Sequence, residues 1–230
     1  MTRRHRRAGA VLAAALAIFA SGHWLGTRAV LRTHPLPGPA DIGFCQDMVA
    51  HHEQAVLMAT LALDRATPAV HDLAQSMLLS QSGEIGVMRG WLQLWGAPLV
   101  APKPMAWMAG SSSGQAQGVV SPFMSQGDAS MPGMASPAEL QKLWQARGKP
   151  FDILFMQLMT RHHEGGLMMA ADIQNSARLQ AVRDTGRGMV FEQTQEIGLM
   201  AQLLQGDGAA PLPSLLQSGA LCRVKPAGRT

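Results

Sequence analysis

The chain of 230 residues is poor in several residue types that enzymes and secreted scaffolds rely on. It has two cysteines, no tyrosine and only 15% charged residues. Neither cysteine has a second one at chelating spacing, which excludes a cysteine-based metal site. No nucleophile elbow, phosphate loop or dinucleotide fingerprint is present, and no alternating pattern predicts strands. We therefore expect an all-α protein that is not an enzyme.

Acidic residues are absent from the first 34 residues, which hold six arginines. Four of these arginines, at positions 3, 4, 6 and 7, precede an apolar run over residues 9–26. The pattern predicts a signal peptide or membrane anchor over residues 1–34, and we favour a retained anchor. The body would then be extracytoplasmic, either membrane-anchored or secreted. The remaining chain has 13 basic and 15 acidic residues, so the basic pI indicates no nucleic-acid surface.

Both cysteines follow this leader, in a compartment that permits oxidation. Cys45 lies near the start of the first predicted helix, and Cys222 lies in an irregular tail over residues 207–230. We expect a disulfide that ties the tail to the helices. Two unrelated thiols are the alternative.

An internal repeat is the most informative feature of the sequence. Residues 44–53, which end in His-His-Glu, recur as residues 155–164 at an offset of 111, and residues 77–88 recur at an offset of 112. The slip of one residue fits a change of loop length within a helical hairpin. Two hairpins, at residues 40–96 and 151–206, each leave an apolar face to bury. They predict a four-helix bundle.

The linker between the hairpins, residues 97–150, is rich in Met, Pro and Gly. A capping-box pattern that starts at Ser136 predicts one short helix in it. The linker also holds two Met-x-x-Met pairs, formed by Met105 with Met108 and by Met131 with Met134. These methionines are either soft-metal ligands or apolar anchors that hold the linker against the bundle.

Helical periodicity places histidine, glutamate and methionine on inward-facing stripes of both hairpins. A buried His or Glu must pair or hold a cation. The sequence leaves three interpretations: structural His–Glu pairs with Met as core filler, a metal site, or a cleft open to solvent. Val87 and Leu199 stand where a di-iron bundle needs histidine. Thioether and imidazole ligands favour copper, particularly Cu(I), and zinc is the second choice.

The duplicated motifs, with Gln81-x-x-Glu84 and Gln193-x-x-Glu196 downstream, resemble those of the domain of unknown function 305 family, actinobacterial type. The resemblance spans residues 40–205 and implies a ferritin-like four-helix bundle, exported or membrane-anchored. Some members bind copper through Met and His. Carried over by motif, the ligands are Met48, His51, His52, Met58, Met88, Met159, His162, His163, Met169 and Met200, with Glu84 and Glu196 as ligands or as partners of ligands.

One departure from the repeat concerns helix pairing. Gly165 and Gly166 replace Gln54 and Ala55 of the first repeat. The loss of these side chains makes the helix packing in the second hairpin either closer or looser than in the first. The two half-sites need not be equivalent.

The leading hypothesis is an extracytoplasmic copper-binding protein that sequesters or transfers Cu(I). The alternative is a non-catalytic structural or interaction module of the cell envelope, with paired core His and Glu and an envelope protein as partner. A metal-dependent oxidase is disfavoured by the few carboxylates and the missing tyrosine.

Overall fold

The computed structural model describes residues 3–33, 35–110 and 131–216. It divides into two compact units, Met1–Pro37 and Gly38–Thr230. The first unit contains helix α1 (Arg3–Thr33). The second contains α2 (Pro39–Arg65), α3 (Pro68–Leu94), the 3-10 helix η1 (Ala106–Gly110), α4 (Pro137–Gln145), α5 (Gly148–Ser176) and α6 (Gln180–Gly206).

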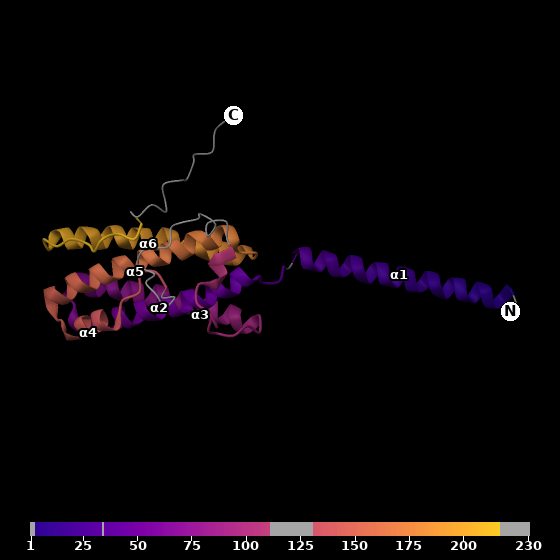
Figure 1. Ribbon diagram of the computed structural model, residues 1–230, viewed down its shortest axis with the longest axis horizontal. Helices are drawn as coiled ribbons and strands as arrows, with labels where there is room; N and C mark the ends of the chain where they lie inside the picture. Colours follow the sequence, from indigo (N-terminus) through magenta and orange to yellow (C-terminus); the bar gives the residue numbers. More distant parts are fainter. Residues whose placement is uncertain (1–2, 34, 111–130, 217–230) are drawn as a thin grey trace, which may run out of the picture. The chain divides into compact units, whose positions relative to one another are not determined.

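The all-helical prediction is confirmed, and the four long helices of the second unit begin and end within a few residues of the predicted positions. Helix α2 packs along α3, and α5 packs along α6, so each repeat forms a hairpin. The hairpins join through α2 and α5, which pack against each other (Figure 1). The first helix of each repeat is therefore the more buried one.

Helix α1 forms over the predicted leader. Within the described ranges, no helix is both long and apolar enough to cross a membrane. The membrane-anchor interpretation gains no support from this, and both interpretations of the leader stay predictions.

Two buried aspartates tie each hairpin to the turn of the other one. The carboxylate of Asp41, with no exposed surface, accepts hydrogen bonds from the backbone N–H of Gly38 (2.7 Å), Arg178 (3.1 Å) and Leu179 (2.9 Å). Asp152 stands at the equivalent position of the second repeat and accepts from the N–H (3.1 Å) and hydroxyl (2.5 Å) of Thr67. Each aspartate thus satisfies backbone donors at the start of a helix in the opposite hairpin.

The predicted capping box at the start of α4 is confirmed. The Ser136 hydroxyl accepts from the N–H of Glu139 (3.3 Å), and the Glu139 carboxylate accepts from the N–H of Ser136 (2.8 Å). Arg161 of α5 donates to both oxygens of the same carboxylate, each at 2.8 Å. These hydrogen bonds lower the pKa of Glu139 to about 2, so its charge is retained at neutral pH and α4 stays fastened to α5.

Cys45 is fully buried and has no disulfide partner among the described residues. Burial, and secondly the charge of Asp41, raises the pKa of its unpaired thiol to about 12. Its predicted disulfide partner, Cys222, lies outside the described residues, so the pairing stays a prediction.

Candidate metal-binding site

The two repeats meet at a pair of histidines in the interface between α2 and α5. The rings of His51 and His162 lie 3.7 Å apart between centroids, tilted by 33°, and each residue is 1% exposed. Nε2 of His162 bonds to the carbonyl of His51 (3.0 Å), and Nε2 of His51 bonds to the carbonyl of Pro132 (3.1 Å). A carbonyl only accepts, so Nε2 carries the proton in both rings and Nδ1 presents a lone pair.

The neighbouring histidines each bond to a glutamate of the second helix in their own hairpin. Nε2 of His52 lies 2.7 Å from a carboxylate oxygen of Glu84, and Nε2 of His163 lies 2.6 Å from one of Glu196. The predicted structural His–Glu pairs therefore form. Donation from Nε2 to a carboxylate also leaves Nδ1 as a free lone pair, which is the arrangement that orients metal-binding histidines in proteins.

Burial keeps the imidazoles of His51, His52 and His162 neutral. It lowers the pKa of His51 to about 3, with a second contribution from His52, and that of His52 to about 3, with a second contribution from His163. The pKa of His162 is lowered well below its usual value for the same reason. Burial, followed by the charge of Glu196, raises the pKa of Glu84 to about 7. Neutral imidazoles can bind a metal at pH 7 without first losing a proton.

Several buried polar atoms in this region have no hydrogen-bond partner in the protein. In the described part of the chain these are Nδ1 of His51, His52 and His163, both amide atoms of Gln81, and Oε1 of Gln193. Each such atom costs about 1–3 kcal/mol unless a partner is supplied. Gln81 and Gln193 stand at equivalent positions of the repeat, at an offset of 112, but they are absent from the predicted ligand set.

The six core methionines of the predicted set have no exposed surface, but they do not converge on one place. Met58, Met159 and Met200 belong to one packed hydrophobic cluster, whereas Met48, Met88 and Met169 belong to another. Each cluster takes methionines from both repeats, and the repeat symmetry exchanges the two sets. The six methionines of the predicted ligand set therefore fall into two sets, one in each cluster, and their role as ligands stays a prediction.

The glutamates that end the two His-His-Glu motifs lie apart from the histidines' hydrogen-bond network. Glu53 is half-exposed on the outer side of α2 and forms an ion pair with Arg89. Glu164 is buried and accepts a hydrogen bond from the N–H of Leu215 (2.7 Å). Glutamate at the same position of the two repeats thus has two different structural roles.

Both Met-x-x-Met pairs of the linker contact the bundle. The N–H of Met105 and the indole N–H of Trp107 donate to the buried carboxylate of Asp47 (2.7 and 2.9 Å). Met105, Trp107 and Met108 pack against the cluster that contains Met48. These contacts support the apolar-anchor interpretation for Met105 and Met108.

Residues 131–135, which we call the strap, include Met131 and Met134 and lie directly against the central histidines. The side chain of Gln54 bonds to both backbone groups of Ala135 (3.0 and 2.6 Å), and the carbonyl of Pro132 accepts from His51. The strap therefore covers the His51–His162 pair. Met131 and Met134 of the strap are both half-buried.

Gly165 makes the close approach of the strap possible. A Cβ at Gly165 would overlap the carbonyl group of Pro132, whereas Gly198 on α6 faces open space. Replacing Gly165 with alanine is expected to push the strap off α5 and lower the free energy of unfolding by about 1–3 kcal/mol. Gly198→Ala is the matched control and should raise stability by up to about 1 kcal/mol. Urea unfolding of both variants checks this; equal, small effects would contradict the close packing of the strap.

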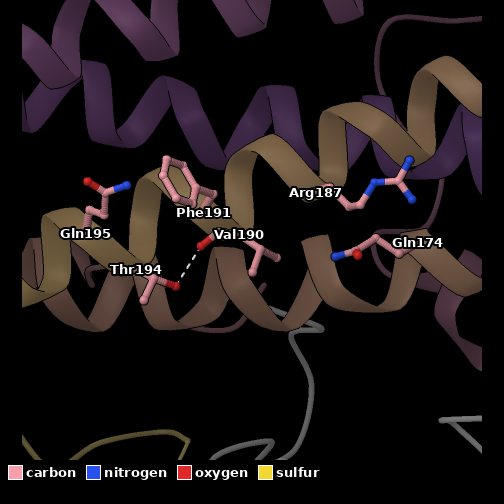
Figure 2. A pocket seen from close by; sticks show the side chains of 6 residues that line it. All are labelled: Gln174, Arg187, Val190, Phe191, Thr194 and Gln195. Carbon is pink, nitrogen blue, oxygen red and sulfur yellow. Dashed lines mark hydrogen bonds between the residues drawn. The ribbon is translucent and has the colours of Figure 1, made fainter. Parts of the chain in front are cut away.

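Among the described residues, no three His, Cys, Asp or Glu side chains come together as a metal-binding group. The surface hollow in Figure 2 is no alternative. It lies on α5 and α6, is lined by Phe191, Val190 and four polar side chains, and contains none of the predicted ligands.

The fold and site define a class: a duplicated helical-hairpin bundle with buried histidines from both halves. Residues 41–204 match the family model described as domain of unknown function (DUF305), and the chain belongs to this family. No curated protein shows a significant match to the chain.

Three solved structures show the likeness in detail. A DUF305 protein of Streptomyces coelicolor, described as secreted, is 37% identical, with a TM-score of 0.66 over 76% of this chain and 97% of that one. A DUF305 fragment from Deinococcus radiodurans is 29% identical, with a TM-score of 0.59 over 75% and 99% of the two chains. CopM in its Cu(II)-bound form is 27% identical, with a TM-score of 0.56 over 72% and 96%.

Proposed function

We propose that this protein is an extracytoplasmic copper-binding protein that sequesters or hands on Cu(I), without catalysing a reaction. The observation that carries the proposal is the group of three buried imidazoles, those of His51, His52 and His163, whose Nδ1 atoms have no partner among the described residues. Two sets of buried methionines lie on the same helices and their hairpin partners. Thioether and imidazole together are the ligand chemistry that Cu(I) prefers.

The relatives support the metal and the compartment. CopM is crystallised in Cu(II)-bound and Cu(I)-bound forms, at 27% and 25% identity to this chain. The Streptomyces relative is described as secreted, which agrees with an arginine-rich leader followed by an apolar run.

Binding would proceed by ligand exchange. A thioether carries no charge and needs no deprotonation, so methionine can capture Cu(I) and release it without a proton step. The hydrogen bonds from Nε2 of His52 and His163 to their glutamates fix the rings and make Nδ1 a better donor. In this proposal Glu84 and Glu196 position the ligands and do not bind the ion themselves.

A structural or interaction module of the cell envelope is the second candidate. The hydrogen bonds from His52 to Glu84 and from His163 to Glu196 favour it, because they satisfy Nε2 of each ring without an ion. It leaves the unpartnered Nδ1 and amide atoms unexplained.

The decisive variant replaces both His52 and His163 with glutamine. A glutamine amide can still donate to Glu84 and Glu196 but offers no imidazole lone pair. We expect the affinity for Cu(I) to fall by about 100-fold, measured by competition with a chromophoric Cu(I) chelator on the tag-free unit Gly38–Thr230.

His71→Gln is the matched control, because His71 is partly exposed and pairs with Asp72, away from the histidines of the two motifs. Unchanged affinity in the double variant would exclude these imidazoles as ligands. No Cu(I) binding by the unaltered unit would reject the proposed function in favour of the structural module.

A further inference from the structure

One end of the bundle has a surface unlike the rest. It comprises residues 38–47, 91–105 and 172–183, and we call it the leader end because α2, which begins here, is the first helix after the leader in the sequence. Contacts gather these segments: Gln46 donates to the carbonyl of Pro98 (2.6 Å), and Asp41 accepts from the N–H of Arg178 and Leu179. Trp91 and Trp95 pack in the same cluster as Ile42.

The leader end exposes large apolar side chains close together in the sequence. Leu94 is 80% exposed, Val100 78% and Leu99 42%. In the same segment the rings of Trp91 and Trp95 are stacked, 6.0 Å apart between centroids, and both are half-buried. Such exposed side chains cost solubility and mark a surface that contacts something apolar.

Within these three segments the accessible charged side chains are basic, and the exposed Asp184 that follows them is already paired with Arg187. The three acidic residues of the leader end, Asp41, Asp47 and Asp172, are all buried. Its basic residues are accessible: Lys103 and Arg178 are exposed and Arg183 is half-buried. The surface therefore combines apolar side chains, tryptophan and positive charge.

The opposite end shows that the fold does not demand this combination. The repeat places Gly206 and Asp207 where the leader end has Leu94 and Trp95. There Asp207 forms an ion pair with Lys149 (3.1 Å), and the exposed Trp144 is covered by the guanidinium of Arg65 at 4.6 Å. Acidic and basic groups are mixed at that end, and its exposed aromatic ring already has a partner.

We propose that the leader end rests on the surface of an anionic phospholipid membrane. Tryptophan and short apolar side chains enter the boundary between headgroups and acyl chains, and basic residues attract anionic headgroups. Charge complementarity selects a membrane as the occupant, and so does the chain itself. The arginine-rich, apolar residues 1–34 join the bundle at this end and at no other.

The test is vesicle co-sedimentation of the unit Gly38–Thr230, which lacks the leader. This unit is compact in its own right, and its Streptomyces relative crystallised with 97% of its length matched by this chain. The vesicles contain phosphatidylcholine with phosphatidylglycerol, or phosphatidylcholine alone. We expect binding to the anionic vesicles only.

Two sets of variants locate the contact. Replacing Leu94 and Val100 with serine should weaken binding by at least about tenfold. Replacing Lys103 and Arg178 with glutamine should weaken it by about fivefold for each charge removed. Leu79→Ser is the matched control, because Leu79 is 70% exposed on the middle of α3, and it should bind unchanged.

Three results would overturn the proposal: no binding of the unaltered unit, equal loss in the Leu79 variant, or equal binding to both vesicle types. Concentration-dependent dimerisation that the Leu94 and Val100 substitutions abolish would assign the surface to a second copy of the chain instead.

Discussion

Replacing Asp41 with alanine is expected to lower the free energy of unfolding by about 2–4 kcal/mol. The substitution leaves the N–H groups of Gly38, Arg178 and Leu179 without their shared acceptor, and an unsatisfied buried donor costs about 1–3 kcal/mol. It also releases the α5–α6 turn from α2, so the loss affects the contact between the hairpins. Urea unfolding followed by circular dichroism measures the effect.

Asp64→Ala is the control for this change. Asp64 lies on the same helix but is exposed, so its removal should change stability by no more than about 0.5 kcal/mol. If Asp41→Ala and Asp64→Ala unfold at the same urea concentration, the crossed aspartates do not hold the hairpins together. Asp152→Ala should resemble Asp41→Ala, because it releases the turn at Thr67.

Replacing Met58, Met159 and Met200 together with leucine is expected to remove about half of the bound Cu(I). These residues form one of the two methionine sets, and the substitution removes sulfur while keeping volume and apolar character. The other set keeps its sulfur atoms and its share of the metal. The mirror variant, with leucine at Met48, Met88 and Met169, should give the same result. Copper per protein after removal of free metal is the measurement.

Met156→Leu is the matched control. Met156 lies in the same cluster as Met58 and has no exposed surface, but it stands outside the proposed set. Loss of all copper from either triple variant would show one shared site and contradict the division into two sets. If both triple variants retained all of their bound copper, the core methionines would not be copper ligands.

The fold could be predicted because its determinants are local and repeated. Helical periodicity, the proline that starts α3 and the capping box of α4 each act within one or two turns. The duplication at offsets of 111 and 112 indicated two equivalent hairpins without any tertiary information. The crossed aspartates carry the same offset, but their acceptor role depends on backbone donors far away in the sequence.

The division of the methionines could have been foreseen from helix geometry alone. Met48 and Met58 share a stripe of α2 but lie about 15 Å apart along the helix axis, so one ion cannot contact both. Their partners across the interface, Met159 and Met169, run in the opposite direction. Periodicity specifies the face of a helix, whereas the level along the axis must be counted separately.

The strap could not be predicted, because nothing local specifies where a linker docks. Its position depends on Gln54 and on the missing side chain of Gly165, two features of different helices that meet only in the folded chain. The sequence did show that Gly165 and Gly166 break the repeat. The structure gives the reason: the first lies under Pro132, and the second lies under the side chain of Gln193.

Diffraction at the copper absorption edge from crystals of the Cu(I)-loaded unit would locate the bound ions. We expect anomalous peaks inside the bundle, one beside the set of Met58, Met159 and Met200 and one beside its mirror set, each within bonding distance of an imidazole Nδ1. Peaks confined to surface groups such as His71, or a loaded protein that retains no copper, would contradict this expectation.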